Sequence, residues 1–252
     1  MIFSKKAQVT IFIILAILAV AIVVIFFVVR GVISPGAGGG IETNPQRFIE
    51  LCAEEEMRNS INLALSQGGF LESENYILYN DTKVSYLCKN NGLFEPCINQ
   101  HPMLLNEISQ ELNDNIKPIV NGCFIELKES FKDLGYEVVL GEDKGTEIML
   151  SPGNVFLSIN RSVSVSKNEE STSFESMKIP YKTSLYELAS VAVDIVKSEA
   201  NLCYFEYLGY MILYPQYIIK IKVYSDSSKV YSIKDANTKE EMSIAIRGCA
   251  LG

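Results

Sequence analysis

Residues 9–29 read VTIFIILAILAVAIVVIFFVV, an apolar run with no charged residue and a single hydroxyl, that of Thr10. At about 1.5 Å rise per helical residue the run spans roughly 31 Å, close to the ~30 Å hydrocarbon core of a bilayer. A helix that is apolar on every side is required in lipid and has little use in a soluble domain. We therefore expect one transmembrane helix from Val9 to Val29, with the lipid bilayer as its partner.

The charges beside this run predict its orientation. Lys5 and Lys6 precede it, and only Arg30 follows it closely. Because positive residues favour the cytoplasmic side, we expect a cytoplasmic N terminus and an extracytoplasmic C-terminal domain in the cell membrane. With these three residues set aside, 19 basic residues stand against 30 acidic ones. Such a domain repels nucleic acid, so no nucleic-acid partner is expected.

All six cysteines lie after the apolar run, at Cys52, Cys88, Cys97, Cys123, Cys203 and Cys249. An even number on the outer side indicates an oxidising compartment, although buried thiols of a cytosolic domain are the alternative interpretation. Six cysteines allow fifteen pairings. We predict Cys88–Cys97, across the turn-forming residues KNNGLFEP, together with Cys52–Cys123 and Cys203–Cys249. The loop-entropy estimate gives each bridge roughly 3–4 kcal/mol of stability.

The composition divides the chain into three segments. Residues 1–30 form the cytoplasmic tip and anchor, 31–45 a linker rich in glycine and proline, and 46–252 an extracytoplasmic domain. Apolar residues at three- and four-residue spacing predict helices at about 45–67 and 184–201, and two helices over 103–132 with a kink or break between them near Pro118 and Gly122. Ser184 and Glu187 fit a capping box at the start of the last helix.

Strands are predicted where apolar and polar residues alternate or β-branched residues gather. In 154–166 the odd positions are apolar and the even ones polar, with Arg161 as the exception, which predicts one strand with one buried face. The expected strands are 76–79, 83–87, 136–140, 147–150, 155–165, 174–180, 207–213, 217–224, 229–233 and 242–247. The predicted fold class is α+β, a single transmembrane helix followed by a disulfide-bonded domain of helices packed on antiparallel sheet.

The first residues, Lys5-Lys6-Ala7-Gln8-Val9-Thr10, resemble the class III (prepilin-type) signals of archaeal type IV pilin-like proteins. The resemblance implies cleavage between Ala7 and Gln8 and pilin-like subunits as partners. Phe12 stands where pilins usually carry a glutamate that pairs with a neighbouring subunit, which favours a solitary anchor over a filament. An uncleaved signal anchor is the alternative interpretation.

A broader resemblance covers most of the chain. An early helix with Cys52 ends in LSQGGF at 65–70, a helical segment leads to Cys123, and a strand and a last helix follow. With the anchor sequence KAQVTIFII, this order is similar to a family of uncharacterised membrane-anchored archaeal proteins. The resemblance implies a single-pass topology and no activity.

No catalytic motif stands out. The chain holds no GxSxG, HExxH or paired CxxC motif, and His101 is its single histidine, so we expect no catalytic site, cofactor or metal site. Asn80 and Asn160 begin glycosylation sequons. We expect a cell-surface protein with a structural or interaction role that contacts other surface proteins. The alternative is an anchored domain that binds a ligand or acts as an enzyme on the envelope, and a deep polar pocket would favour it.

Overall fold

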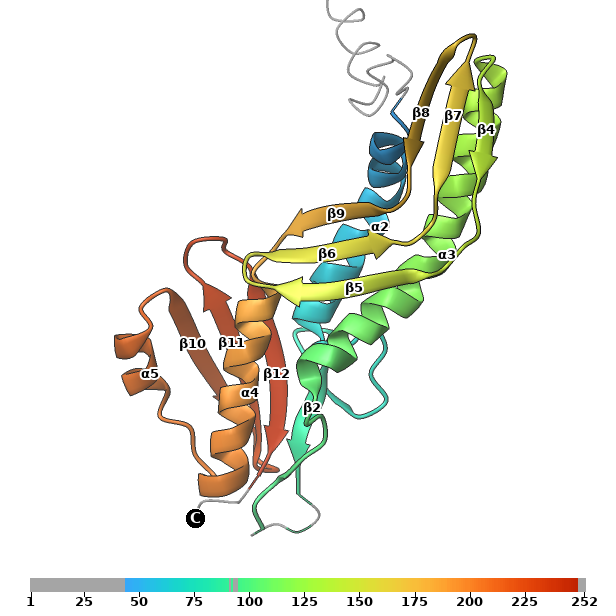
Figure 1. Ribbon diagram of the computed structural model, residues 1–252. Coiled ribbons are helices and arrows are strands. Elements are labelled where there is room, and N and C mark those ends of the chain that lie inside the picture. Colours follow the sequence, from blue (N-terminus) through green and yellow to red (C-terminus); the bar gives the residue numbers. More distant parts are fainter. Residues whose placement is uncertain (1–43, 91, 93–94, 249–252) are drawn as a thin grey trace, which may run out of the picture. The chain divides into compact units, whose positions relative to one another are not determined.

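The computed structural model describes residues 44–90, 92 and 95–248 (Figure 1). The predicted membrane anchor and the predicted cleavage site lie outside these residues. No helix within them is long and apolar enough to cross a membrane. The described part is an α+β domain of four helices and three sheets.

Two helices lie side by side at the start of the domain. α2 (Pro45–Ser66) begins after Asn44, whose Oδ1 accepts from the backbone N–H groups of Gln46 and Arg47. α3 (Leu104–Asp133) is one helix of 30 residues, so the predicted break near Pro118 is wrong. Pro118 removes one backbone hydrogen bond, but buried side chains continue along the same face on both sides of it, and their packing keeps the helix continuous.

The largest sheet joins distant parts of the chain. Its strand order is β1-β2-β12-β11-β10. β3 pairs with the last two residues of β2, Cys88 and Lys89. β12 and β2 run parallel, whereas the other neighbours are antiparallel, so this sheet is mixed. The strands are β1 (Tyr76–Tyr79), β2 (Thr82–Lys89), β3 (Ile98–Asn99), β10 (Tyr217–Val223), β11 (Ser228–Asp235) and β12 (Glu241–Arg247).

Two three-stranded antiparallel sheets lie beside α3 (Figure 1). One has the order β4-β7-β8 and the other the order β5-β6-β9. The strands are β4 (Glu137–Leu140), β5 (Thr146–Ser151), β6 (Asn154–Ile159), β7 (Val163–Lys167), β8 (Glu170–Phe174) and β9 (Met177–Lys182). β8 was not predicted, apart from Phe174, and the predicted strand 174–180 corresponds mainly to β9.

The predicted strand 155–165 is two strands in different sheets. The odd positions are buried in both, as the alternation predicted. The chain turns at Arg161, whose guanidinium carbon lies 4.9 Å from the centre of the Phe124 ring and whose Nε donates to the Gly141 carbonyl. This corner residue is the one exception to the alternation, because its side chain leaves both sheets and reaches across to α3.

Two further helices follow the small sheets. α4 (Leu185–Leu202) packs its apolar face on β11 and β12. The expected capping box does not form, because the Ser184 hydroxyl bonds Glu240 and Glu187 accepts from the Gly153 backbone N–H instead. Residues 207–213, predicted as a strand, form α5 (Tyr207–Leu213), in which the Glu206 carboxylate accepts from the Gly209 N–H.

One hydrophobic core runs through the domain. It is formed by the facing sides of α2, α3 and α4 and the inner faces of the sheets. A smaller cluster on the other face of the large sheet contains Val84, Tyr86, Val230 and Ala245. The two faces of the large sheet therefore differ, and only one of them carries α4.

Candidate functional site

Four of the six cysteines form two described disulfides. Cys52 of α2 is bonded to Cys123 of α3, and Cys88 of β2 is bonded to Cys97. These are two of the three pairs proposed from the sequence. Cys203 is also disulfide-bonded, whereas Cys249 lies outside the described residues, so their pairing stays a prediction. We call the first two bridges the α2–α3 disulfide and the β2 disulfide.

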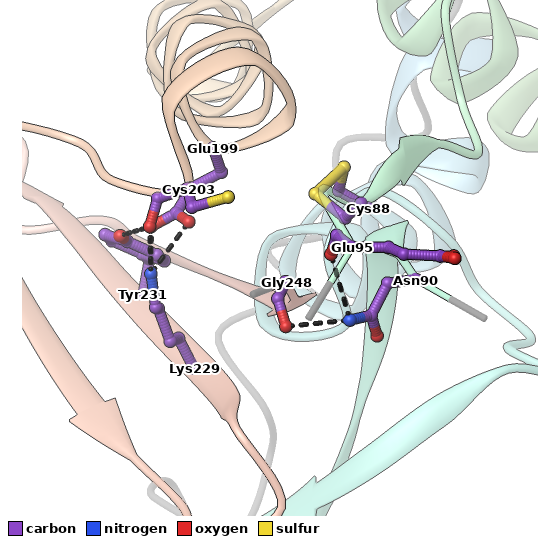
Figure 2. A network of polar contacts seen from close by, with 9 residues as sticks. Cys88, Asn90, Glu95, Glu199, Cys203, Lys229, Tyr231 and Gly248 are labelled. Atoms are coloured by element: carbon purple, nitrogen blue, oxygen red, sulfur yellow. Dashed lines mark hydrogen bonds and ion pairs between the residues drawn. A yellow bond between two sulfur atoms is a disulfide. The ribbon is translucent and has the colours of Figure 1, made fainter. Parts of the chain in front are cut away.

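The β2 disulfide adjoins a buried asparagine (Figure 2). Asn90 donates from Nδ2 to the carbonyls of Glu95 and Gly248, at 3.1 and 2.9 Å. One amide thus connects the loop closed by the disulfide to the end of β12. This arrangement stabilises the fold and offers no exposed reactive group.

A buried ion pair joins α4 to β11 (Figure 2). Glu199 of α4 has no exposed surface. Lys229 Nζ lies 2.8 and 2.7 Å from its two carboxylate oxygens and donates to the Cys203 carbonyl at 2.9 Å. The Tyr231 hydroxyl donates to the same carboxylate, and burial, followed by this contact with Glu199, raises the pKa of Tyr231. The carboxylate is fully satisfied and closed to solvent, which suits a structural role.

His101 is paired with an acid at the rim of a small hollow. Its Nδ1 lies 2.6 Å from Oε2 of Glu107, and its ring lies 4.4 Å from that of Phe70, centre to centre. In the part of the chain that the structure describes, no three His, Cys, Asp or Glu side chains come together as metal ligands would, and this includes the surroundings of His101. The sequon residues Asn80 and Asn160 are both exposed, so each is accessible, and their glycosylation stays a prediction.

A cleft of about 470 Å³ lies between α3, β5 and the first turn of α4. α3 contributes a polar face that includes Asn106, Gln110 and Asn113, while Tyr186 comes from α4. The Thr146 hydroxyl donates to Asn113 Oδ1 at 2.9 Å. The cleft is open to solvent and is lined by both polar and apolar side chains, as many small binding sites are.

The two most exposed large apolar side chains of the described residues, Ile212 and Leu213, lie on α5. Leu208, Ile212 and Leu213 are 55, 80 and 75% exposed, and Tyr204 and Tyr214 flank them. We call these five residues the α5 surface. Figure 1 shows α5 beside β10, at one end of the large sheet.

The opposite side of α5 holds the helix in place. Tyr207, Tyr210 and Met211 pack against the core, and the Met211 sulfur accepts from the backbone N–H of Ile219 at 3.1 Å. Burial, and next a hydrogen bond from its hydroxyl to Asp194, raises the pKa of Tyr210. These contacts fix α5 on the domain, so the α5 surface lies on a helix that is held in place by the core.

Sequence reasoning missed the α5 surface, although a signal was present. No charged residue occurs from 207 to 219, in a chain in which 21% of residues are charged. Residues 207–213 were predicted as a strand, because apolar runs of this length do not distinguish a strand from a helix. Glu199 was also missed, although it continues the apolar stripe of α4 one turn after Ile195 and Val196.

Comparison with protein-family models, curated proteins and solved structures finds no match to this chain. Its function must therefore be argued from the residues themselves.

Proposed function

We propose that the chain is a single-pass membrane protein of the cell surface whose extracytoplasmic domain binds another protein through the α5 surface. The address rests on the apolar run 9–29, on Lys5 and Lys6 before it, and on the confinement of cysteines to the residues after it. Disulfides within the described domain agree with an oxidising compartment.

The α5 surface is the observation that supports an interaction role. Isolated apolar side chains on a surface need no explanation, but three aliphatic side chains flanked by two tyrosines within eleven residues form a concentration. The buried centre of a protein interface is more apolar than its rim, is enriched in tyrosine and is depleted of charged residues. The uncharged stretch from 207 to 219 has this composition.

The first twelve residues bear on whether the chain is cleaved and whether it forms a filament. Cleavage between Ala7 and Gln8 would leave the apolar run at the mature N terminus, and the exposed domain would then resemble a pilin-like subunit. Phe12 lacks the carboxylate that would pair with a neighbouring subunit, so we propose a solitary anchor rather than a filament. Mass spectrometry of the purified protein tests cleavage, because retention of residues 1–7 contradicts it.

The interaction is tested by photo-crosslinking in the intact membrane. A photoreactive amino acid at Ile212 should give one discrete protein adduct, and Leu208→Lys in the same chain should abolish it. The control position is Leu78 of β1, which is also exposed and apolar but lies at the other end of the large sheet. Equal adducts from both positions, or none from Ile212, would contradict the proposal.

The orientation of the chain in the membrane is tested separately. Protease added to intact spheroplasts should digest the domain after residue 43 and leave a cytoplasmic control protein untouched. Protection of the domain, alongside digestion of a known outward-facing protein, would show that the orientation is wrong.

A further inference from the structure

The cleft between α3 and β5 follows the edge of a strand. Five consecutive residues of β5, from Thr146 to Leu150, line it. Side chains in a strand alternate between its two faces, so consecutive residues meet at one cavity only along the strand's edge. β5 is an end strand in the order β5-β6-β9, and its other neighbour in space is α3 (Figure 1).

The hydrogen-bond pattern shows which backbone groups face the cleft. Asn160 N–H donates to the Gly145 carbonyl, so this carbonyl is directed at β6, whereas the Gly145 N–H donates to Asp143 Oδ1. In an antiparallel pair this direction alternates, and it therefore recurs at Glu147, Met149 and Ser151. The main-chain N–H and C=O groups of Thr146, Ile148 and Leu150 point the other way, along the edge that lines the cleft.

The facing wall of the cleft supplies side-chain amides. Asn106, Gln110 and Asn113 lie at three- and four-residue steps on α3 and so share one side of the helix. The Thr146 hydroxyl donates to Asn113 Oδ1 and so fixes which end of the Asn113 amide faces Thr146. The Nδ2 donor is at the other end of the amide. Amides donate and accept at once, as main-chain peptide groups do.

The charges and apolar groups of the cleft restrict its ligand. Asp114 and Glu147 line it, and among the lining residues there is no lysine, arginine or histidine. Acidic ligands are therefore disfavoured and basic ones favoured. Met149 and Tyr186 add apolar surface that can contact alternate side chains of a strand.

We propose that this cleft binds an extended, basic peptide, which adds to β5 as a new outer strand. Main-chain bonds to Thr146, Ile148 and Leu150 give affinity, and the two carboxylates select for positive charge. The stretch from Thr146 to Leu150 is about 14 Å long at ~3.4 Å per residue, which accommodates four to five peptide residues. The proposal does not depend on the α5 surface.

The test uses the full chain in mild detergent and a fluorescein-labelled eight-residue peptide of alternating lysine and valine. Binding is followed by fluorescence anisotropy. A second peptide of the same sequence carries N-methyl groups on those backbone nitrogens that would face β5. It cannot donate hydrogen bonds to the β5 carbonyls, so it should bind about tenfold more weakly or not at all. A peptide with glutamate in place of lysine should also lose most of its affinity.

Two proline variants make a matched pair. Leu150→Pro removes one N–H that faces the cleft and leaves the β5–β6 hydrogen bonds intact, and it should weaken binding roughly fivefold. Val138→Pro does the same on β4, the end strand of the other small sheet, since Gly141 N–H bonds Ser162 and the pattern alternates from there. That variant should leave affinity unchanged within about twofold.

Hydrogen exchange gives an independent readout. Bound peptide should protect the amides of Ile148 and Leu150 more than those of Val138. Equal binding of the N-methylated and unmodified peptides, tighter binding of the glutamate peptide, or no binding at about 1 mM peptide would overturn the proposal. If Leu150→Pro unfolds the domain, the modified peptides on the unaltered chain still decide the question.

Discussion

Replacing Lys229 with methionine tests how the domain holds a charge in its interior. Methionine keeps most of the aliphatic stem and its packing but removes the ammonium group. The Glu199 carboxylate then retains only the Tyr231 hydroxyl among the contacts described above. A buried carboxylate without its cation is costly.

The magnitude follows from the burial of the two partners. Breaking a buried ion pair on one side costs about 3–5 kcal/mol. Glu199 is fully buried, but the Lys229 side chain is 12% exposed, so water can partly replace the ammonium group. We therefore expect a loss of about 3 kcal/mol. For a domain of this size each kilocalorie lowers the melting temperature by about 2–4 °C, which gives a fall of about 6–12 °C.

Thermal unfolding of the full chain in mild detergent, followed by circular dichroism, measures this effect. Lys222→Met is the matched control, because that lysine lies exposed on β10 and its removal should change stability by at most about 0.5 kcal/mol. The double variant Glu199→Gln and Lys229→Met should have a free energy of unfolding within about 1 kcal/mol of the parent chain, since no unpaired charge remains in it. A melting temperature of Lys229→Met within 2 °C of the parent, a limit set by the ~2–4 °C per kilocalorie scale, would refute the reasoning.

Three further predictions concern the framework of the domain. Replacing both cysteines of the α2–α3 disulfide by alanine should cost about 4 kcal/mol, against about 2.5 kcal/mol for the β2 disulfide, because the sequence separations are 71 and 9. The short loop thus falls below the roughly 3–4 kcal/mol expected for each bridge from the sequence, and melting curves of the two variants give the order. Gly69→Ala should cost about 2 kcal/mol in the same assay, since φ is +106° and a Cβ would lie 2.9 Å from the Ile108 side chain, whereas Gly122→Ala, with nothing within 4 Å, should gain up to about 1 kcal/mol. The raised pKa of Tyr231 contributes stability that is complete below pH ~10 and is lost above it at about 1.4 kcal/mol per pH unit. The stability measured by denaturant unfolding should therefore fall less steeply above pH ~10 in Tyr231→Phe than in the parent chain.

The regular helices could be predicted because their signal is local. The apolar steps along α2 and α4 identify both helices, since a period of 3.6 residues is contained in the sequence itself. The alternation in 154–166 likewise identified the buried positions. It could not show that the chain changes sheets at Arg161, because that depends on Phe124, which is distant in sequence.

The candidate sites were harder to predict than the elements. Whether the apolar residues of 207–213 are buried or exposed depends on which side of the helix meets β10, and both arrangements have the same composition. The cleft likewise requires α3 to lie along the outer edge of β5. Neither contact has a local signature.

The α+β class, the helical periods of α2 and α4 and the alternation of buried residues can be predicted from the amino-acid sequence, because each is set by neighbours along the chain. The folded domain is needed to establish the parallel pairing of β2 with β12, the burial of Glu199 beside Lys229, and the exposure of the α5 surface. The first two depend on segments 30 or more residues apart, and the third on which side of α5 meets β10. Each is selected by the packing of the whole domain.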